Sequence, residues 1–267
     1  MKLSAIVITK NEQDVIETAL KTLAFADEII VADSGSTDNT VKIAKKYATK
    51  IVKTTGNSFS QWRNQALKAA KGDWILYLDA DERIPPKLAR EIIATINEPI
   101  HDAYTIPRYE VLLGKHLNHW SDPRVLRLIK RSSMSKWKGI LHEQPEIKGT
   151  IGKLKEQMIH LTHRDLTSMI AKTSKWSIKE ASMLKKAGHP KMVGWRFFRI
   201  LFTELFQRLI KQGLWKDGTE GVLEAIFQSF SRFFSYARLW EMQREPSLIK
   251  TYKHIDKKIL EEWAKED

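Results

Sequence analysis

The chain has 267 residues, a mass of 31.0 kDa and no cysteine, which excludes a disulfide scaffold, a thiolate metal site and a cysteine nucleophile. With 42% hydrophobic and 29% charged residues, the composition is that of a globular protein and not of a disordered one. The net charge of +13 is uneven, because residues 1–100 hold 14 basic and 13 acidic side chains while residues 101–267 hold 31 and 19. This asymmetry indicates a polyanionic partner for the second half, with a merely basic surface as the alternative.

The first hundred residues alternate between short apolar runs and segments with helical spacing. We expect strands at residues 3–8, 28–32, 50–53 and 74–78, and helices at residues 11–23, 39–47, 60–70 and 85–96. This alternation predicts an α/β fold with a mostly parallel sheet. Polar residues follow three of the four strands, and ligands of such sheets bind at the carboxyl ends of the strands. The sequence therefore predicts one convergent site.

The pattern changes after residue 103. We expect strands at 103–110 and 124–130, and then helices at 165–185, 195–211 and 219–241. We place a soft domain boundary near residue 165, which gives a first domain of residues 1–165 and a helical extension of residues 166–267. The N-terminus does not have the pattern of a signal peptide, and no apolar run is long enough to cross a membrane. We expect a cytoplasmic protein, or one peripheral on the cytosolic face of the inner membrane.

Asp79-Ala80-Asp81 is the sharpest local motif. Two carboxylates that flank one residue at a strand end can bind Mg²⁺ or Mn²⁺, which would also bind phosphate oxygens of a substrate. The alternative is a solvated acidic turn. The segment from Asp33 to Asp38 is weaker, since by itself it is typical of a turn that leads into a helix.

Four motifs occur in one order along the chain: residues 6–12 (Ile-Val-Ile-Thr-Lys-Asn-Glu), 33–38 (Asp-Ser-Gly-Ser-Thr-Asp), Arg63-Asn64, and 78–82 (Leu-Asp-Ala-Asp-Glu). Together they resemble glycosyltransferase family 2, over most of residues 1–165. The resemblance implies a GT-A fold, which is a Rossmann-like, mostly parallel sheet that binds a nucleotide-diphospho-sugar. It also implies a metal-dependent hexosyltransferase that inverts the anomeric carbon by direct displacement.

The resemblance also implies roles for the matched residues. The donor-binding residues would be Thr9, Asn11, Glu12, Asp33, Arg63 and Asp79. Within that set, Asp33 would read a uracil-type base and Arg63 would lie near the donor diphosphate. Asp79 and Asp81 would bind the divalent metal.

Many members of the family carry their catalytic base in a later Glu-Asp motif, which this chain lacks. Trp137-Lys138-Gly139-Ile140-Leu141-His142-Glu143 stands in its place, and a lipopolysaccharide-core subset of the family has a similar His-Glu pair. We take Glu143 as the catalytic base, with His142 as the alternative.

A histidine from residues 160–163 would complete the metal shell. We favour His163 over His160, although a structural role is as plausible for both.

Arg124 and Arg127 are candidates for pairing with donor phosphates, or else plain surface charges on a strand.

The helices after residue 195 combine aromatic and basic residues at helical spacing. Such helices bind anionic membrane surfaces, or they pack as ordinary core. The lipopolysaccharide-core subset has a similar tail, including the connection from Gly213 to Gly218.

The sequence thus predicts a bacterial glycosyltransferase, similar to lipopolysaccharide-core glucosyltransferases of the WaaE/KdtX type. We expect it to transfer a sugar, most simply glucose, from a UDP-linked donor to the lipopolysaccharide inner core or a lipid-linked saccharide. The acidic groups of such a core would match the basic second half. The alternatives are a peptide or protein glycosyltransferase, a nucleotidyltransferase, and a non-enzymatic protein that binds nucleic acid or membranes. A nucleic acid is not the partner that we expect.

Overall fold

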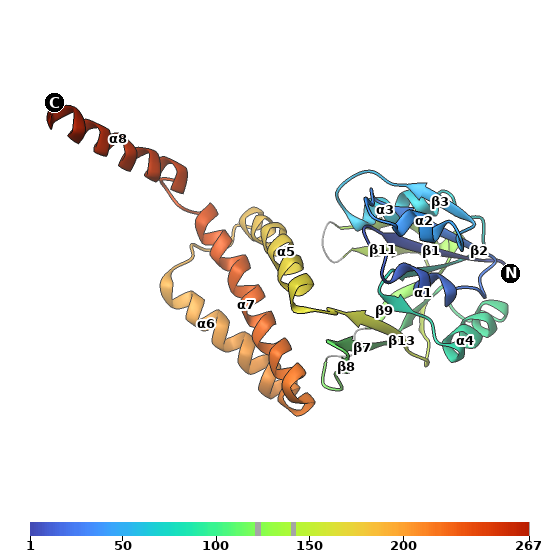
Figure 1. Ribbon diagram of the computed structural model, residues 1–267. Coiled ribbons are helices and arrows are strands. Elements are labelled where there is room, and N and C mark those ends of the chain that lie inside the picture. The colour runs from blue at the N-terminus through green and yellow to red at the C-terminus, as the bar shows by residue number, and fades with distance from the viewer. Residues whose placement is uncertain (121–123, 140–142, 267) are drawn as a thin grey trace. The chain divides into compact units, whose positions relative to one another are not determined.

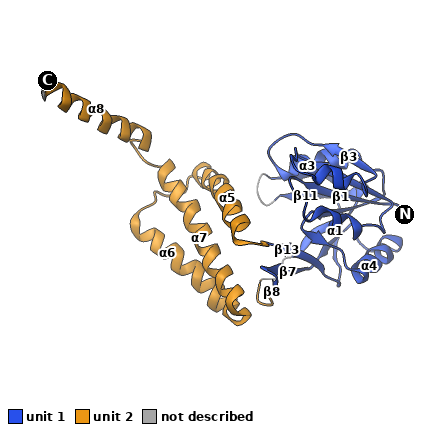
Figure 2. Ribbon diagram, in the orientation of Figure 1, with its two compact units in different colours: residues 1–116, 121–162 blue, residues 117–120, 163–267 orange. Residues whose placement is uncertain are grey.

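The computed structural model describes residues 1–120, 124–139 and 143–266. Its contacts divide the chain into two compact units (Figure 2). The first unit comprises residues 1–116 and 121–162, and the second comprises residues 117–120 and 163–267. The short segment 117–120 therefore belongs with the C-terminal part, although it lies between two segments of the first unit in the sequence.

A seven-stranded sheet forms the centre of the first unit (Figure 1). In spatial order its strands are β12 (Ile151–Lys153), β6 (Ala103–Ile106), β9 (Val125–Lys130), β4 (Trp74–Asp79), β1 (Leu3–Thr9), β2 (Glu28–Asp33) and β3 (Lys50–Lys53). β1 pairs in parallel with both β2 and β4, and β2 pairs in parallel with β3. Only β9 runs against its neighbours β4 and β6. The mostly parallel sheet predicted from the sequence is confirmed.

Apolar side chains on both faces of this sheet hold the first unit together. All seven residues of β1 are buried, as expected of a strand covered on both faces. Its alternate residues enter two separate apolar clusters, with Val7 in one and Ile6 in the other. The helices of this unit are α1 (Ile16–Lys21), α2 (Thr40–Ala44), α3 (Phe59–Leu67) and α4 (Pro86–Asn97).

The predicted strand 103–110 is in fact two strands that lie in different sheets. Pro107 separates β6 from β7 (Arg108–Leu112). Because proline has no N–H to donate to a ladder, the chain leaves the central sheet there. β7 joins a second sheet with the order β5 (Glu82–Arg83), β13 (Met158–Thr162), β7 and β8 (Lys115–His116).

A hairpin and a short helix complete the first unit. The 3₁₀ helix Arg131–Ser133 follows β9 and leads into β10 (Met134–Lys138). β10 pairs antiparallel with β11 (Gln144–Ile147), and the undescribed segment 140–142 lies between these strands in the sequence. This hairpin brings Trp137 against Tyr77 of β4, with ring centroids 5.0 Å apart.

The second unit is helical. Its helices are α5 (Leu166–Lys186), α6 (Gly194–Phe206), a π-helical turn (Gln207–Lys211), a 3₁₀ turn (Leu214–Asp217), α7 (Gly218–Met242) and α8 (Leu248–Glu266). Three of these helices, α5, α6 and α7, were predicted from the sequence, whereas α8 was not, and the 3₁₀ turn lies in the connection from Gly213 to Gly218. α7 packs against both α5 and α6. Among the described residues, no helix is long and apolar enough to cross a membrane.

The connection from Gly213 to Gly218 is a structural anchor within the second unit. The buried carboxylate of Asp217 accepts hydrogen bonds from the backbone N–H groups of Asn118 and His119, at 3.2 and 2.9 Å, and it contacts the His119 ring. Burial opposes ionisation of this carboxylate, but the hydrogen bonds from His119 and Asn118 outweigh it and lower the pKa of Asp217. Asp217 therefore holds residues 117–120 against the helices.

Candidate active site

The carboxyl ends of three neighbouring strands meet at one edge of the central sheet. Thr9, the last residue of β1, lies opposite Asp33, the last residue of β2. On the other side of β1, Ile8 lies opposite Asp79, the last residue of β4. The structure thus brings together three of the predicted donor-binding positions, at the kind of edge where α/β sheets bind ligands.

The loops after β1 and β2 are tied to each other. Asn11 has a left-handed backbone with φ of 56°, and its side-chain oxygen accepts a hydrogen bond from the Thr37 N–H at 2.8 Å. The Asn11 N–H donates to the Ser36 hydroxyl at 2.9 Å, and the Glu12 N–H donates to the Thr40 hydroxyl at 2.7 Å. These bonds pre-organise the two loops in a single arrangement.

Asp33 forms the turn that was the alternative interpretation of its motif. Its carboxylate accepts hydrogen bonds from the N–H groups of Gly35 and Ser36 and from the Ser36 hydroxyl, at 2.5 to 3.2 Å. Asp33 therefore shapes the loop after β2. Whether it also contacts a base stays a prediction.

Asp79 lies between two arginines. Its Oδ1 accepts from Arg63 Nη2 at 2.7 Å, and its Oδ2 accepts from Arg127 Nη2 at 2.5 Å. Burial opposes ionisation, but the two guanidinium groups outweigh it and hold the pKa of Asp79 well below its usual range. Asp79 is therefore an anion, and both of its oxygens are engaged by cations.

Arg63 connects the Asp-Ala-Asp motif to the predicted base. Its side chain, 4% exposed, donates from Nη2 to Asp79 and from Nη1 to Glu143 Oε1. The guanidinium also lies 4.6 Å from the centre of the Trp137 ring, on the hairpin that precedes Glu143. Residues from α3, β4 and the loop after β10 are thus joined by one side chain. His142, the alternative base, lies outside the described residues.

A second group of buried charged residues makes hydrogen bonds with Asp79. Glu82 is fully buried, and its carboxylate accepts from the Asp79 N–H and from Arg127, both at 2.8 Å. Burial raises the pKa of Glu82, although Arg127 opposes the shift. Arg127 is 5% exposed, so the interpretation of this residue as a plain surface charge was wrong. It is the shared partner of two carboxylates at the end of β4.

Asp81 faces His160. His160 Nε2 lies 3.4 Å from Asp81 Oδ2, and its Nδ1 lies 2.5 Å from Glu110 Oε2. Burial disfavours the charged ring, but the two carboxylates outweigh it and raise the pKa of His160 to about 9. His163, the favoured metal ligand, belongs to the second unit and has a left-handed backbone with φ of 48°. Its assignment as a ligand stays a prediction.

A divalent cation fits these residues only in part. Within residues 1–120, 124–139 and 143–266, no cluster of three or more acidic or histidine side chains is arranged to hold a metal. Asp81 is a suitable oxygen ligand, whereas both oxygens of Asp79 already accept from arginines. Magnesium-type ions are commonly held by one or two carboxylates together with substrate phosphates. The residues therefore fit such a cation only with phosphate oxygens of a substrate as further ligands.

The sequence analysis missed several residues of this network. Glu82 was noted only as the residue after the Asp-Ala-Asp motif, although its carboxylate accepts a hydrogen bond from the Asp79 N–H. Arg108 and Glu110 were taken for ordinary strand residues, and Arg108 pairs with Glu110 at 2.9 Å. The only signal in the sequence is the occurrence of charged residues within apolar strands, and that signal does not identify their partners.

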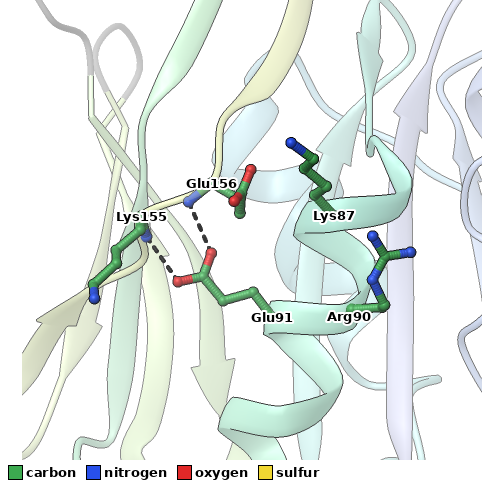
Figure 3. Close-up of a pocket in the computed structure, with 5 residues that line it drawn as sticks. All are labelled: Lys87, Arg90, Glu91, Lys155 and Glu156. Atoms are coloured by element: carbon green, nitrogen blue, oxygen red, sulfur yellow. Dashed lines mark hydrogen bonds between the residues drawn. The ribbon is translucent and has the colours of Figure 1, made fainter.

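A separate hollow of about 420 Å³ lies between α4 and the segment that precedes β13 (Figure 3). Its lining is charged, and the Glu91 carboxylate accepts from the N–H groups of Lys155 and Glu156 at 2.8 Å each. None of its residues is among the predicted site residues. These hydrogen bonds attach the segment to α4, which is a structural role.

The fold defines the class of protein: an α/β protein with a mostly parallel sheet and a helical C-terminal part. The model of the family described as glycosyl transferase family 2 matches residues 4–164, and the chain belongs to this family. The predicted GT-A fold class is therefore confirmed, as is the prediction of a glycosyltransferase.

Relatives of the chain extend the match beyond the catalytic region. A glycosyltransferase of Rickettsia bellii, named as uncharacterized, is 29% identical over 90% of this chain and 87% of its own length. The lipopolysaccharide core biosynthesis glycosyltransferase LpsC of Rhizobium meliloti is 26% identical over 90% of this chain and 93% of its own length. Among solved structures, the chain is similar to residues 1–349 of Staphylococcus aureus TarS in complex with UDP-GlcNAc. The match covers 92% of this chain and 93% of the TarS chain, with 17% identity and a TM-score of 0.46.

Proposed function

We propose that this glycosyltransferase moves glucose from UDP-glucose to the inner core of a bacterial lipopolysaccharide, with inversion at the anomeric carbon. The similarity to LpsC over nearly the whole chain supports the acceptor class. The excess of basic residues after residue 100 supports it as well, because such cores carry phosphates and acidic sugars. The acceptor is anchored in lipid, so we also propose that the enzyme acts at the cytosolic face of the inner membrane.

The observation that carries the catalytic proposal is the double contact of Arg63 with Asp79 and Glu143. One buried guanidinium connects the motif expected to bind the donor with the carboxylate expected to activate the acceptor. An ordinary surface ion pair would be exposed and would contribute little. The pair of Arg63 and Glu143 is instead largely buried, with side chains 4% and 12% exposed, so Arg63 holds the Glu143 carboxylate near the end of β4.

The proposed reaction is a single displacement. Glu143 accepts the proton of the acceptor hydroxyl while that oxygen attacks the anomeric carbon, and the bond from this carbon to the diphosphate oxygen breaks. Asp81 would hold the divalent cation, with Asp79 beside it and His163 as a further proposed ligand. When bound, the cation neutralises charge that develops on the leaving diphosphate. Thr9, Asn11, Glu12 and Asp33 would bind the nucleoside.

The donor is tested by thermal unfolding of the full chain with UDP, UDP-glucose, UDP-GlcNAc and GDP-mannose, each with Mn²⁺ or with EDTA. A ligand present at about one hundred times its Kd stabilises the folded state by about 2.7 kcal/mol. We expect UDP and UDP-glucose to raise the melting temperature in Mn²⁺, and we expect Asp81→Asn to lose this metal-dependent rise.

Other results would change the proposal in defined ways. A stronger rise with UDP-GlcNAc would replace glucose by that sugar. Equal rises in Mn²⁺ and EDTA would contradict the metal assignment. Stabilisation by nucleic acid, with no response to any nucleotide sugar, would contradict the whole proposal.

A further inference from the structure

The second unit contains an apolar helix that buries none of its residues. α6 carries phenylalanines, a tryptophan and aliphatic side chains along thirteen residues. Phe197 and Ile200 are half-buried against the core of the second unit, and none of the thirteen is fully buried. Trp195, Phe198, Phe202 and Phe206 are exposed and recur every three or four residues, so they lie along one face. The most exposed of the four is Phe202, at 71%. Exposed apolar faces of this extent mark interaction surfaces in soluble proteins.

α7 extends this apolar surface. Ile226 and Phe230 of α7 are exposed, and together with Phe198 and Phe202 they line a groove between the two helices. Leu201, Leu205 and Ser229 also line this groove, which has a volume of about 270 Å³, and Ser229 is the one polar residue among the described residues of its lining. These four residues are three phenylalanines and one isoleucine, and we call them the aromatic rim: Phe198, Phe202, Ile226 and Phe230.

Positive charge accompanies the apolar surface. From Gly194 to Lys211 the chain has four basic residues and one acid, Glu204. This acid is paired with Arg208 at 3.4 Å and with Arg232 at 3.5 Å, so its charge is offset. The uncompensated charge along this helix is therefore positive, and a partner that covers the rim should be anionic.

Tryptophans lie beside cations at both ends of this helical stretch. The guanidinium groups of Arg196 and Arg199 lie 5.3 and 5.7 Å from the Trp195 ring, and the Lys216 ammonium lies 5.7 Å from the Trp215 ring. Both tryptophans are more than half exposed. Tryptophan with a neighbouring cation is typical of the boundary between lipid headgroups and acyl chains.

We propose that the aromatic rim, with Arg196 and Arg199, docks the enzyme onto an anionic lipid bilayer. Phenylalanines would enter the acyl boundary and the arginines would contact phosphates of the headgroups. The proposal rests on the proposed function only for the location of the acceptor in a membrane. The surface itself is argued from exposure, spacing and charge in α6 and α7. A second protein chain is the competing occupant, and the test distinguishes it.

The test is co-sedimentation of the full chain with vesicles of phosphatidylcholine, alone or mixed with phosphatidylglycerol. We expect binding to the anionic vesicles, and we expect Phe198→Ser with Phe202→Ser to weaken it about tenfold or more. Arg196→Gln with Arg199→Gln should weaken binding to anionic vesicles about fivefold for each arginine and should leave binding to neutral vesicles unchanged. Ile100→Ser is the matched control, because Ile100 is 84% exposed in the first unit.

Two further measurements separate the possible failures. Thermal unfolding checks that each variant is folded, and light scattering reports the oligomeric state. Absence of vesicle binding, or equal binding by the phenylalanine variant and the wild type, would overturn the proposal. A wild-type dimer that the phenylalanine variant dissociates would assign the rim to self-association. Transfer to a lipid-free saccharide should not change in these variants, so a failure of docking is distinguishable from a failure of the proposed function.

Discussion

The buried arginines of the first unit and an exposed arginine of α6 in the second unit are used in opposite ways. In the first unit Arg63 and Arg127 are buried, and each binds two carboxylates at the end of β4 or beside it. In the second unit Arg199 is exposed and lies over the Trp195 ring. A buried arginine must be paired because an isolated charge is very costly to desolvate. An exposed arginine beside an aromatic ring remains available to an external partner.

The hydrophobic residues of the two units differ in the same way. β1 and β4 bury nearly all of their side chains inside the first unit, whereas α6 buries none. The first unit thus holds a few charged groups in one geometry, which is the property that the proposed catalytic role needs. The second unit leaves apolar surface unsatisfied, which is the property of a region that contacts another body. The comparison supports the two proposals that catalysis belongs to the first unit and contact with a membrane to the second.

The largest effect should come from Glu143→Gln, which tests whether the chemistry resides in the first unit. The amide cannot accept the acceptor proton, so we expect kcat to fall about 100- to 10,000-fold. Binding of UDP should persist, because Glu143 is expected to act on the acceptor. Steady-state kinetics with UDP titration measures both quantities.

The matched control for that change is Glu146→Gln, three residues further along the same hairpin. Glu146 is 39% exposed and pairs with Lys138 on the surface. Its loss should leave kcat within about twofold, since exposed pairs contribute about 0 to 1 kcal/mol. Normal turnover in Glu143→Gln, or an equal loss in both variants, would contradict the assignment of the base.

The next largest effect should come from Arg127→Met, which tests the buried charges themselves. Without the guanidinium, Asp79 and Glu82 lose a shared partner, and we expect the free energy of unfolding to fall by about 3 to 5 kcal/mol. Arg131→Met, at an exposed residue just after the same strand, should change it by less than about 0.5 kcal/mol. Chemical denaturation of both variants gives the comparison, and equal stabilities would show that the pairing contributes nothing.

The smallest effect should come from Gly221→Ala. This change tests whether the second unit is closely packed where α7 meets residues 214–217. A Cβ at Gly221 would lie 2.0 Å from the Leu214 carbonyl oxygen and 2.8 Å from Cβ of Asp217. We expect a loss of about 1 to 3 kcal/mol from this overlap. It exceeds the gain of up to about 1 kcal/mol that alanine gives within a helix.

Gly194→Ala is the control for the helix preference. An added Cβ at Gly194 meets nothing within 4 Å, at the start of α6. This variant should be as stable as the wild type or slightly more stable in thermal unfolding. If Gly221→Ala behaves in the same way, the anchor formed by residues 213–218 is looser than the structure indicates.

Much of the first unit could be predicted from local pattern. The strand at Lys50–Lys53 has the bounds that were expected, and the strands that begin at Leu3, Glu28 and Trp74 each end one residue later than predicted. Short β-branched and apolar runs, separated by polar turns, determine these elements locally. The break at Pro107 was missed although proline within a strand pattern is a local signal for it, and α8 was missed although its spacing is helical.

The family, the mostly parallel sheet and the acidic motifs could be predicted from the chain alone, because the motifs and the alternation of strands and helices are local patterns. Which charges meet depends on the tertiary structure. The contacts from Arg63 to Glu143 and from His160 to Glu110 span 80 and 50 residues. The contact from Asp217 to Asn118 spans 99 residues. Periodicity reports which face of an element is apolar, whereas the partner of a buried charge depends on how the sheets and helices pack, so it had to be read from the fold.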